Sequence, residues 1–542
     1  MNKTHSISAE TGAADSSSAT VVLLCGDLQS LDNGLDLSGL CLSLQQTQPP
    51  EVSGRVVPGL CHAPPGLFPS TAPGTGRVVL GLCSRAYAER EMHAQLRRAG
   101  LDPLGVEVVD LGRFCTPVRH GPFRMAKARL LLAAAVARAR AYPGSHAENL
   151  AIRFPQLSQK MSRRALWALP PVRYVAVASV DSRLCLRGAG CDLCLRVCSG
   201  QALQSTKESI LVNKARCDAC GLCVSACPTG AVQLPGGAPE QFETQVSALL
   251  EAGPVALPQR GIMFLCRQRN GSRREAGPES TAASASWLPV EVPCAGMVPA
   301  SWVLLCLARG TPVGVMGCDV PCPKGQQDTI AGRLDYCRQL LEALGASPDW
   351  VQSVKPEGSP DTPASVLPQS KPNAPVSLPR PGAASAAVLA LATATGAPST
   401  LSLAHPQSPF GTVDVRVERC TQCGLCAASC PTGALALEEG QGTVSLTFDA
   451  SLCIACGLCA GRCPEAGDQA LQFRKATDLG RLRQGRITLI RDEFLRCSAC
   501  GAPIAPKGMV RRIAELLGDQ YPGIATTVER YCPDCRVASG PG

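Results

Sequence analysis

The chain has 542 residues, 31 Cys and a formal net charge of +9 at pH 7. This length exceeds what a single hydrophobic core normally serves, so about three or four domains are expected. With 45% apolar and 18% charged residues the chain can build folded domains, although aromatic residues make up only 4%. The Cys content is too high for ordinary cytosolic domains and lies below the roughly 8–10% typical of short disulfide scaffolds. The positive charge by itself suggests an acidic partner, but this count treats every thiol as neutral.

The composition also excludes several classes of protein. The first residues show no positively charged stretch leading into an apolar run, so no secretory signal is expected. No window holds about 18 consecutive apolar residues, so no direct membrane insertion is expected. We therefore expect a cytoplasmic protein, in which disulfides are rare and clustered Cys are more often metal ligands or redox centres. We find no catalytic triad, no phosphate-binding loop and no basic stripe with interleaved aromatic residues, which argues against nucleic acid, flavin and nicotinamide binding.

The N-terminal part of the chain predicts one α/β domain and one Cys-rich domain. Residues 1–19 are polar, and we expect them to be disordered. Residues 20–150 combine strand-like apolar runs at 21–24 and 78–81 with a helical stretch at 123–140, which is typical of an α/β domain. Residues 172–236 then place eight Cys among short strands and turns.

A second α/β domain is predicted for residues 241–353, where apolar strand-like runs alternate with helical periods. The strand-like runs are residues 261–265 and 313–317, and the helical periods are residues 299–308 and 329–344. Residues 271–286 are rich in Ser, Ala and Gly and predict a loose loop within this domain.

A segment rich in Pro, Ser and Ala, residues 354–411, predicts a disordered linker that lets the following domain swing between partners. Residues 412–476 repeat the eight-Cys pattern, and residues 487–542 form a tail with four more Cys. The predicted fold class is therefore a multidomain chain of α/β plus α+β type. It combines two small α/β domains, two eight-Cys domains and a four-Cys tail.

The strongest signal is a pair of Cys-x2-Cys-x2-Cys-x3-Cys-Pro runs at residues 420–431 and 453–464. Three thiolates at this spacing can bind three irons of a cubane, and the fourth Cys, before Pro, ligates the other cluster. The pair resembles the bacterial two-cluster ferredoxin, which implies two [4Fe–4S] clusters. Structural zinc is the alternative, but zinc needs two Cys-x2-Cys knuckles and not two complete runs. The resemblance implies one ligand set of Cys420, Cys423, Cys426 and Cys463, and a second set of Cys453, Cys456, Cys459 and Cys430.

The earlier eight-Cys segment is regular in its second half only. In its first half Gly188 stands where the first ligand is usual, and Cys185 precedes it on a longer loop. A [3Fe–4S] cluster is the alternative at this irregular site. We expect two [4Fe–4S] clusters, one on Cys185, Cys191, Cys194 and Cys227, and the other on Cys217, Cys220, Cys223 and Cys198.

The second α/β domain contains four candidate cluster ligands. The segments at residues 292–298 and 317–323, with their Pro-Cys and Gly-Cys pairs, resemble the delta subunit of methyl-viologen-reducing hydrogenase. That family has a small α/β domain with a [2Fe–2S] cluster and passes electrons from hydrogenase to heterodisulfide reductase. A Cys-x2-Cys pair is usual at its first position, whereas Cys266 stands alone here. The implied [2Fe–2S] ligands are Cys266, Cys294, Cys318 and Cys322, and four buried structural thiols are the alternative.

The N-terminal domain has Cys-containing segments at residues 24–26, 60–66, 82–85 and 114–116, and a further characteristic segment at residues 99–103. Together these segments resemble the start of the A subunit of heterodisulfide reductase. The resemblance implies an iron–sulfur cluster on Cys25, Cys61, Cys83 and Cys115; without it, buried apolar Cys would be the favoured interpretation. That family continues into a flavin-binding domain, whereas this chain continues into its first eight-Cys segment. Flavin is therefore not expected in this chain.

The tail has two Cys-x2-Cys knuckles, Cys497 with Cys500 and Cys532 with Cys535, around a helical stretch at residues 509–517. Paired knuckles favour a closed tetrahedral zinc site, with a rubredoxin-like iron or another cluster as the alternatives. Three Cys remain. Two of them fall in apolar helical periods and are expected to be buried, and the third could replace an N-terminal ligand; these are Cys306, Cys337 and Cys41.

These assignments predict an iron–sulfur electron-transfer subunit of a cytoplasmic complex that is heterodisulfide-reductase-like or hydrogenase-linked. Its expected partners are redox subunits, namely a flavin-containing protein, a hydrogenase or a heterodisulfide-reductase-like protein. The alternatives are a reductase with a substrate-active N-terminal cluster, marked by an iron with only three thiolates, and a non-redox scaffold. Because bound thiolates are deprotonated, seven four-thiolate sites would reverse the formal charge, so the basic balance is no sign of an acidic partner.

Overall fold

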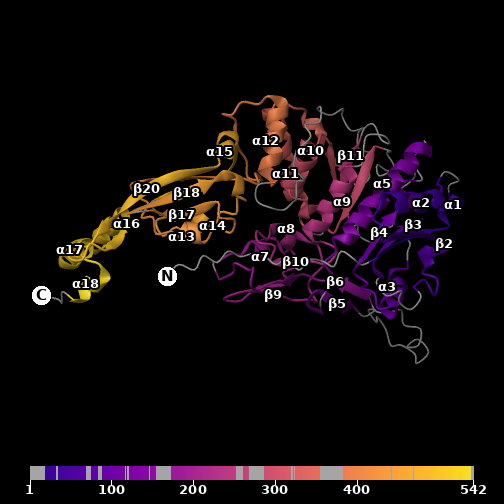
Figure 1. Ribbon diagram of the computed structural model, residues 1–542, viewed down its shortest axis with the longest axis horizontal. Coiled ribbons are helices and arrows are strands. Elements are labelled where there is room, and N and C mark those ends of the chain that lie inside the picture. The colour runs from indigo at the N-terminus through magenta and orange to yellow at the C-terminus, as the bar shows by residue number, and fades with distance from the viewer. Residues whose placement is uncertain are drawn as a thin grey trace.

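The computed structural model shows an elongated mixed α/β protein of several domains (Figure 1). The expected disordered N-terminus, the loop at 271–286 and the first half of the expected linker lie almost entirely outside the described residues. The residues that the structure describes are 19–31, 35–68, 75–83, 88–115, 118, 121–145, 147–153, 173–188, 190–251, 260–267, 286–318, 322, 324–354, 383–440, 442–467 and 469–538.

The N-terminal domain is a four-stranded parallel sheet in the order β2-β1-β3-β4. The apolar run predicted at residues 21–24 lies in β1, which is fully buried at its carboxyl end because sheet neighbours flank it on both sides. The strands are β1 (Ala19–Cys25), β2 (Val52–Val57), β3 (Thr75–Leu82) and β4 (Val106–Asp110). The helices are α1 (Leu28–Leu31), α2 (Leu37–Thr47), α3 (Glu89–Arg98), α4 (Leu111–Phe114) and α5 (Gly121–Arg140).

The second α/β domain is also a four-stranded parallel sheet, in the order β12-β11-β13-β14. Its strands β11 and β13 are buried at every position, as expected for a sheet covered on both faces. The strands are β11 (Gly261–Cys266), β12 (Trp287–Val292), β13 (Val313–Met316) and β14 (Val351–Val354). The helices are α9 (Pro239–Glu251), α10 (Ala300–Ala308) and α11 (Gln327–Ala343).

The two α/β domains share one topology, which the sequence analysis did not foresee. In both, the first strand lies between the second and the third, and all pairings are parallel. The register also agrees, because Cys25 is paired with Val57 and Cys266 with Val292, each the last residue of its strand. In both, the residue after the first strand donates its N–H to the last carbonyl of the second strand, over 2.8 Å. The two domains therefore have the same strand order and the same register at the carboxyl edge of the sheet.

The first ferredoxin-type domain consists of short elements wound around its Cys. The domain also includes strand β5, which lies before the start predicted at residue 172. Strand β5 pairs with β6, and its Arg153 side chain donates hydrogen bonds to three backbone carbonyls of the turn at 214–217. The strands are β5 (Leu150–Arg153), β6 (Arg173–Ala176), β7 (Ser179–Val180), β8 (Leu203–Ser205), β9 (Ile210–Val212) and β10 (Val232–Gln233). The helices are α7 (Leu193–Val197) and α8 (Leu222–Ala226).

The second ferredoxin-type domain is continuous with the tail. Strand β20 pairs with β18 over seven positions, so the tail expected at 487–542 contributes a strand to the ferredoxin sheet β17-β18-β20-β21. The strands are β15 (Ser402–Ala404), β16 (Gly411–Val415), β17 (Leu435–Glu439), β18 (Thr443–Asp449), β19 (Leu471–Asp478), β20 (Arg486–Arg496) and β21 (Pro503–Pro506). The helices are α13 (Leu425–Ala428), α14 (Leu458–Arg462), α15 (Leu479–Gln484), α16 (Lys507–Leu517), α17 (Pro522–Arg530) and α18 (Pro533–Ala538).

The second half of the expected linker is ordered, which corrects the prediction of a disordered segment over 354–411. Residues 383–395 form α12 (Ala383–Thr395), and 402–404 form β15, which pairs with β19. Helix α12 packs on α10 and buries Val388 and Leu391 (Figure 1). Nearby, the hydroxyls of Tyr336 and Thr477, both buried, lie 2.7 Å apart. The second ferredoxin domain is thus docked on the second α/β domain and does not hang on a free tether.

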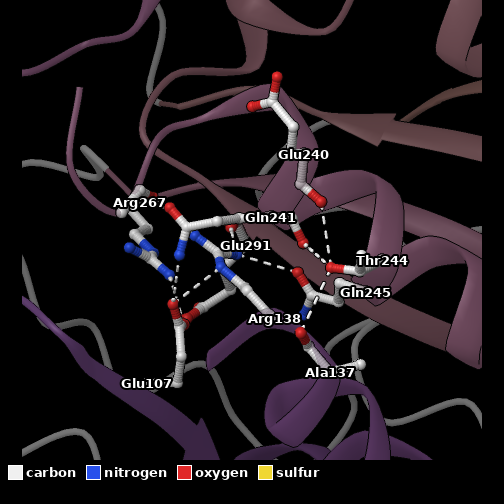
Figure 2. Close-up of polar contacts among 10 residues, drawn as sticks. Glu107, Ala137, Arg138, Glu240, Gln241, Thr244, Gln245, Arg267 and Glu291 are labelled. Atoms are coloured by element: carbon white, nitrogen blue, oxygen red, sulfur yellow. Dashed lines mark hydrogen bonds and ion pairs between the residues drawn. The ribbon is translucent and has the colours of Figure 1, made fainter. Parts of the chain in front are cut away.

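A buried arginine, Arg138, connects the N-terminal domain to the segment that leads into the second α/β domain (Figure 2). The Arg138 guanidinium of α5 forms an ion pair with Glu107 of β4 at 3.0 Å and lies over the ring of Phe242 at 4.2 Å. It also donates to the Gly236 carbonyl at 2.7 Å and to the Gln245 side chain at 2.9 Å. Because these partners belong to different domains, this one side chain fixes their relative position.

Candidate iron–sulfur and metal sites

The second ferredoxin domain forms two cavities, each lined by four thiols. One has about 400 Å³ of empty space and is lined by Cys420, Cys423, Cys426 and Cys463. The other has about 320 Å³ and is lined by Cys430, Cys453, Cys456 and Cys459. The structure therefore brings together the Cys in the two sets that the spacing predicted. Cavities lined by four soft thiolates and otherwise mostly by apolar atoms fit an iron–sulfur cluster.

The local backbone explains how each run of Cys bends round its cavity. Gln422 and Ala455 have positive φ of 51° and 54°, and each places its own N–H toward the thiol two residues before it. A left-handed glycine, Gly424 or Gly457, then begins the short helix that carries the third Cys. Burial raises the pKa of Cys453 to about 11, and the backbone N–H groups oppose that rise because they stabilise the thiolate.

The first ferredoxin domain shows the same arrangement at four thiols of its regular site. Burial raises the pKa of Cys223, and the neighbouring Cys220, Cys217 and Cys198 raise it further. The N–H of Ala202 donates to Cys198 Sγ at 3.2 Å. These four Cys are the set that the sequence predicted for this site.

The irregular site is also assembled, despite its longer loop. Burial raises the pKa of Cys194 to about 11, and Cys227, Cys191 and Cys185 raise it further because they carry like charge nearby. Cys227 and Cys430 are equivalent, since each approaches the hydroxyl of the Thr two residues later, at 3.7 and 3.8 Å. The structure thus places Cys185 with the other three predicted thiols.

The four candidate [2Fe–2S] ligands converge at the carboxyl edge of the second α/β sheet. The pKa of Cys294 is raised by a hydrogen bond with Cys266 and by burial. Burial raises the pKa of Cys318 to about 12, and the thiols of Cys266 and Cys322 add to this rise. The Sγ atoms of Cys318 and Cys322 are 3.6 Å apart. Cys266 thus ends its strand, and Cys294 and Cys318 each follow the end of a strand by two residues.

The N-terminal sheet brings three of the four predicted thiols close together. Cys61 Sγ lies 3.0 Å from Cys83 Sγ and 3.6 Å from Cys25 Sγ, at the carboxyl edge of the sheet. Cys115 lies outside this group. Burial raises its pKa to about 12, and its charged neighbours are Lys127, Asp110 and Arg124. It lies elsewhere because the α4 turn carries it past the end of β4 and into the core under α5.

The shared topology relates the two sheet-edge sites to each other. Cys25 and Cys266 end the first strand, Cys61 and Cys294 follow the second, and Cys83 and Cys318 follow the third. The fourth thiol of the second domain, Cys322, has no counterpart among the 31 thiols, all of which lie in the described residues. Ligands of open α/β sheets bind at such an edge, where the strand order reverses. The N-terminal group is therefore a three-thiolate version of the same cradle.

The tail brings its four predicted thiols together. Cys497, Cys500, Cys532 and Cys535 have Sγ atoms within 4.8 Å of one another. A tetrahedral site with Zn–S bonds of about 2.3 Å needs sulfurs about 3.8 Å apart, and Cys500 and Cys532 are separated by 3.7 Å. Backbone N–H groups near Cys532 and Cys500 lower the pKa of Cys497 to about 6. The group therefore fits zinc in size and donor type.

The remaining thiols lie apart from these groups. Cys306 and Cys337 are fully buried in α10 and α11, and burial raises the pKa of each to about 12. This agrees with the packing role predicted for them. Cys41 is half-buried in α2, and burial raises its pKa also. The sequence analysis named Cys41 as a candidate replacement ligand in the N-terminal domain, but it does not belong to the three-thiol group there.

Neighbouring sites approach one another across the domain boundaries. Cys220 contributes to the raised pKa of Cys294, after the hydrogen bond with Cys266 and burial. Cys191 likewise adds to the raised pKa of Cys456, after burial and Cys430. Packing is close at both junctions. Met297 Sδ lies 2.7 Å from where a Cβ on Gly221 would stand, and the Arg462 guanidinium fills the space that a side chain at position 190 would need.

Comparison with known families supports the cluster assignment in part. Residues 419–466 match the 4Fe-4S dicluster domain, and residues 210–233 match the 4Fe-4S binding domain. No curated protein matches the chain. Within the described residues, no helix is both long and apolar enough to cross a bilayer. The chain is thus an iron–sulfur protein with ferredoxin-type [4Fe–4S] domains, and its further thiol groups could bind metal as well.

Proposed function

We propose that this chain is an electron-transfer subunit that relays electrons along a fixed line of iron–sulfur sites. The observation that carries the proposal is the nearness of successive thiol groups, together with the close packing of Met297 against Gly221 and of Arg462 against Gly190. Cys294 lies near Cys220, Cys194 near Cys223, and Cys191 near Cys456. One-electron transfer is the chemistry that iron–sulfur clusters supply when bound. The chain's own part is to hold the sites in order.

The proposed line begins at the Cys266 site and ends at the Cys420 site. It passes through the regular site of the first ferredoxin domain, then the irregular site, and then the Cys453 site. At the first junction Lys324 forms an ion pair with Asp218 and lies near both Cys220 and Cys294. Its positive charge therefore offsets the negative charge of the thiolates on both sides of the junction. Seven of the twenty thiols along the line are buried and the other thirteen are partly buried. This limited access of water lowers the reorganisation that each transfer requires.

The assignments of the other sites are part of the same proposal. We assign a [2Fe–2S] cluster to the four thiols of the second α/β domain and zinc to the tail, which stabilises the fold there and carries no electrons. The resemblance to hydrogenase delta subunits and to the heterodisulfide reductase A subunit supports partners of those classes. A flavin-containing subunit is the proposed entry or exit partner, since the chain has no recognised flavin motif.

The proposal is tested on chain purified without oxygen, by metal, sulfide and flavin analysis together with EPR. We expect roughly 16–22 iron per chain, from four [4Fe–4S] clusters, one [2Fe–2S] cluster and an N-terminal cluster. About one zinc and no flavin are expected besides. Reduction by a low-potential donor and reoxidation support the relay. Clusters that undergo neither would leave the scaffold alternative, and stoichiometric flavin would contradict the assignment of flavin to a separate subunit.

A second function is favoured by one observation, the three-thiol group of Cys25, Cys61 and Cys83. A cubane held by three thiolates leaves one iron without a protein ligand, which is where a substrate could bind. This would make the chain a reductase with a substrate-active N-terminal cluster. The test is turnover of a disulfide by the isolated chain with a low-potential donor. Activity that is lost in Cys83→Ser and kept in Cys115→Ala would establish it, and no turnover would reject it.

A further inference from the structure

One buried side chain in the Cys420 cavity has no partner. Gln422 is only 4% exposed, and neither its amide nitrogen nor its amide oxygen has a hydrogen-bond partner among the described residues. A buried amide without a partner is costly, so native structures rarely keep one without a reason. Gln422 lines the same cavity as the four thiols that would hold a cluster. A group bound in this cavity would lie next to Gln422 and would supply the missing partner.

The equivalent positions in the other ferredoxin turns are apolar. In each ferredoxin run the residue directly before the second Cys is Gly190, Ala219, Gln422 or Ala455. Three of these, Ala219, Gln422 and Ala455, share a positive φ between 51° and 54°. The backbone is thus the same, and only position 422 adds a side-chain donor. Any effect of that donor is confined to one of the four sites.

We propose that the Gln422 amide donates a hydrogen bond to the cluster bound by Cys420, Cys423, Cys426 and Cys463 and thereby raises its reduction potential above that of the Cys453 site. A donor stabilises the more negative, reduced form more than the oxidised form. Electrons therefore collect at the Cys420 end of the line. This inference rests on the proposed function, because it gives that relay a direction.

The nearby acidic groups do not cancel this effect. Asp492 lies close enough to Cys420 to raise the pKa of that thiol, and Glu465 does the same to Cys463. Each is engaged elsewhere: Asp492 accepts from the Gly508 N–H at 2.7 Å, and Glu465 forms an ion pair with Arg512 at 3.0 Å. Their negative charge is therefore partly compensated, whereas the Gln422 amide has no competing partner.

The Cys420 end is also where the line reaches an open surface. A cavity with about 1020 Å³ of empty space lies between β20 and α16, and Cys420 is one of its lining residues. Lys507 and Arg511 line it as well, together with Asp492 and Glu529. An electron held at this end thus lies next to a surface that an acceptor can approach. The direction set by Gln422 agrees with this placement.

The test is an EPR-monitored redox titration of the full holoprotein. Gln422→Leu keeps the size and removes the donor, and Gln469→Leu makes the same change at an exposed position outside the cavity. We expect Gln422→Leu to lower the equilibrium constant for reducing one component about tenfold, which is about 59 mV for one electron. Gln469→Leu should change none. Cys426→Ser identifies the component, because it removes a ligand of the same site.

A second variant keeps the inference testable if Gln422→Leu fails to assemble its cluster. Ala219 is half-buried, so Ala219→Gln has room to add the donor at the equivalent position of another site, and that site should become easier to reduce by a similar factor. Unchanged midpoints in the assembled variants would overturn the role of Gln422. If the wild-type clusters cannot be reduced at all, the relay itself is contradicted.

Discussion

Replacing Arg138 by Met tests most sharply how the domains are held together. The side chain is only 1% exposed, and burial lowers its pKa to about 10, so it stays charged at neutral pH. Without the Arg138 guanidinium, the buried Glu107 carboxylate keeps a longer ion pair with Arg267, at 4.0 Å (Figure 2). The carbonyl of Gly236 also loses its donor.

The expected cost follows from these contacts. Removing one partner of a buried ion pair typically costs about 3–5 kcal/mol, because the other charge stays buried. Since about 1.4 kcal/mol is a factor of ten, opening of the α5–α9 interface should become about 10² to 10⁴ times more frequent. Removing both charges, in Arg138→Met with Glu107→Met, should restore at least half of the loss, because no buried charge is then left without its partner.

The assay is native-state hydrogen exchange of the anaerobic holoprotein, read on peptides from α5 and α9. Peptides from β17 and β18 serve as the internal reference. Arg140→Met is the matched control on the same helix: its ion pair with Glu51, at 3.5 Å, is partly exposed and worth less than about 1 kcal/mol. A loss of protection no larger than in Arg140→Met, or a double variant worse than the single one, would refute the reasoning.

Three further predictions concern other parts of the chain. Glu243 is buried, and its Oε1 has no partner among the residues that the structure describes. Burial, with Glu240 nearby, raises its pKa to about 9, so the folded state keeps it neutral while the unfolded state ionises above about pH 4.5. Stability should therefore fall from about pH 5 to pH 9, and Glu243→Gln should raise the melting temperature at pH 8 but hardly at pH 5. Cys532→Ser in the tail should remove about one zinc and no iron, as measured by elemental analysis. Leu391→Asp places a charge in the buried contact between α12 and α10, so the second ferredoxin domain should detach from the second α/β domain. We expect faster proteolysis after residue 383, and weaker spin coupling between the cluster bound by Cys191 and the cluster bound by Cys456.

Each of these has a result that contradicts it. A pH profile of melting that is identical in wild type and Glu243→Gln would mean that this carboxyl is not held neutral. Loss of iron together with zinc in Cys532→Ser would identify the tail as a cluster site. For Leu391→Asp, unchanged proteolysis and coupling would show that α12 does not fix the domain.

The sequence predicts those parts of the molecule that depend on local pattern. The helices α5, α10, α11 and α16 appear where the apolar periods are, and the ferredoxin thiols meet as their spacing requires. Spacing works there because a Cys-x2-Cys-x2-Cys turn is a local geometry that the backbone can adopt in one way. The same holds for the tail, whose two knuckles are each local.

The features that escaped prediction depend on distant contacts. The two α/β domains have different apolar sequences, and their thiols match only through strand order and register. Cys115 carries no signal that distinguishes a ligand from a core residue, and the α4 turn places it apart from the other three thiols. Helix α12 is Ala-rich and resembles a linker, because its stability comes from burying Val388 and Leu391 on α10. The sequence assigns strand β20 to the tail, and only its pairing with β18 shows that it belongs to the ferredoxin sheet.

The most direct test of the relay is low-temperature EPR of the full holoprotein reduced by a low-potential donor and then reoxidised. Because successive sites lie next to each other, we expect the signals of the reduced clusters to be broadened by mutual spin coupling, and the coupling should disappear on reoxidation. Sharp, independent signals at full reduction, or clusters that cannot be reduced, would contradict the account.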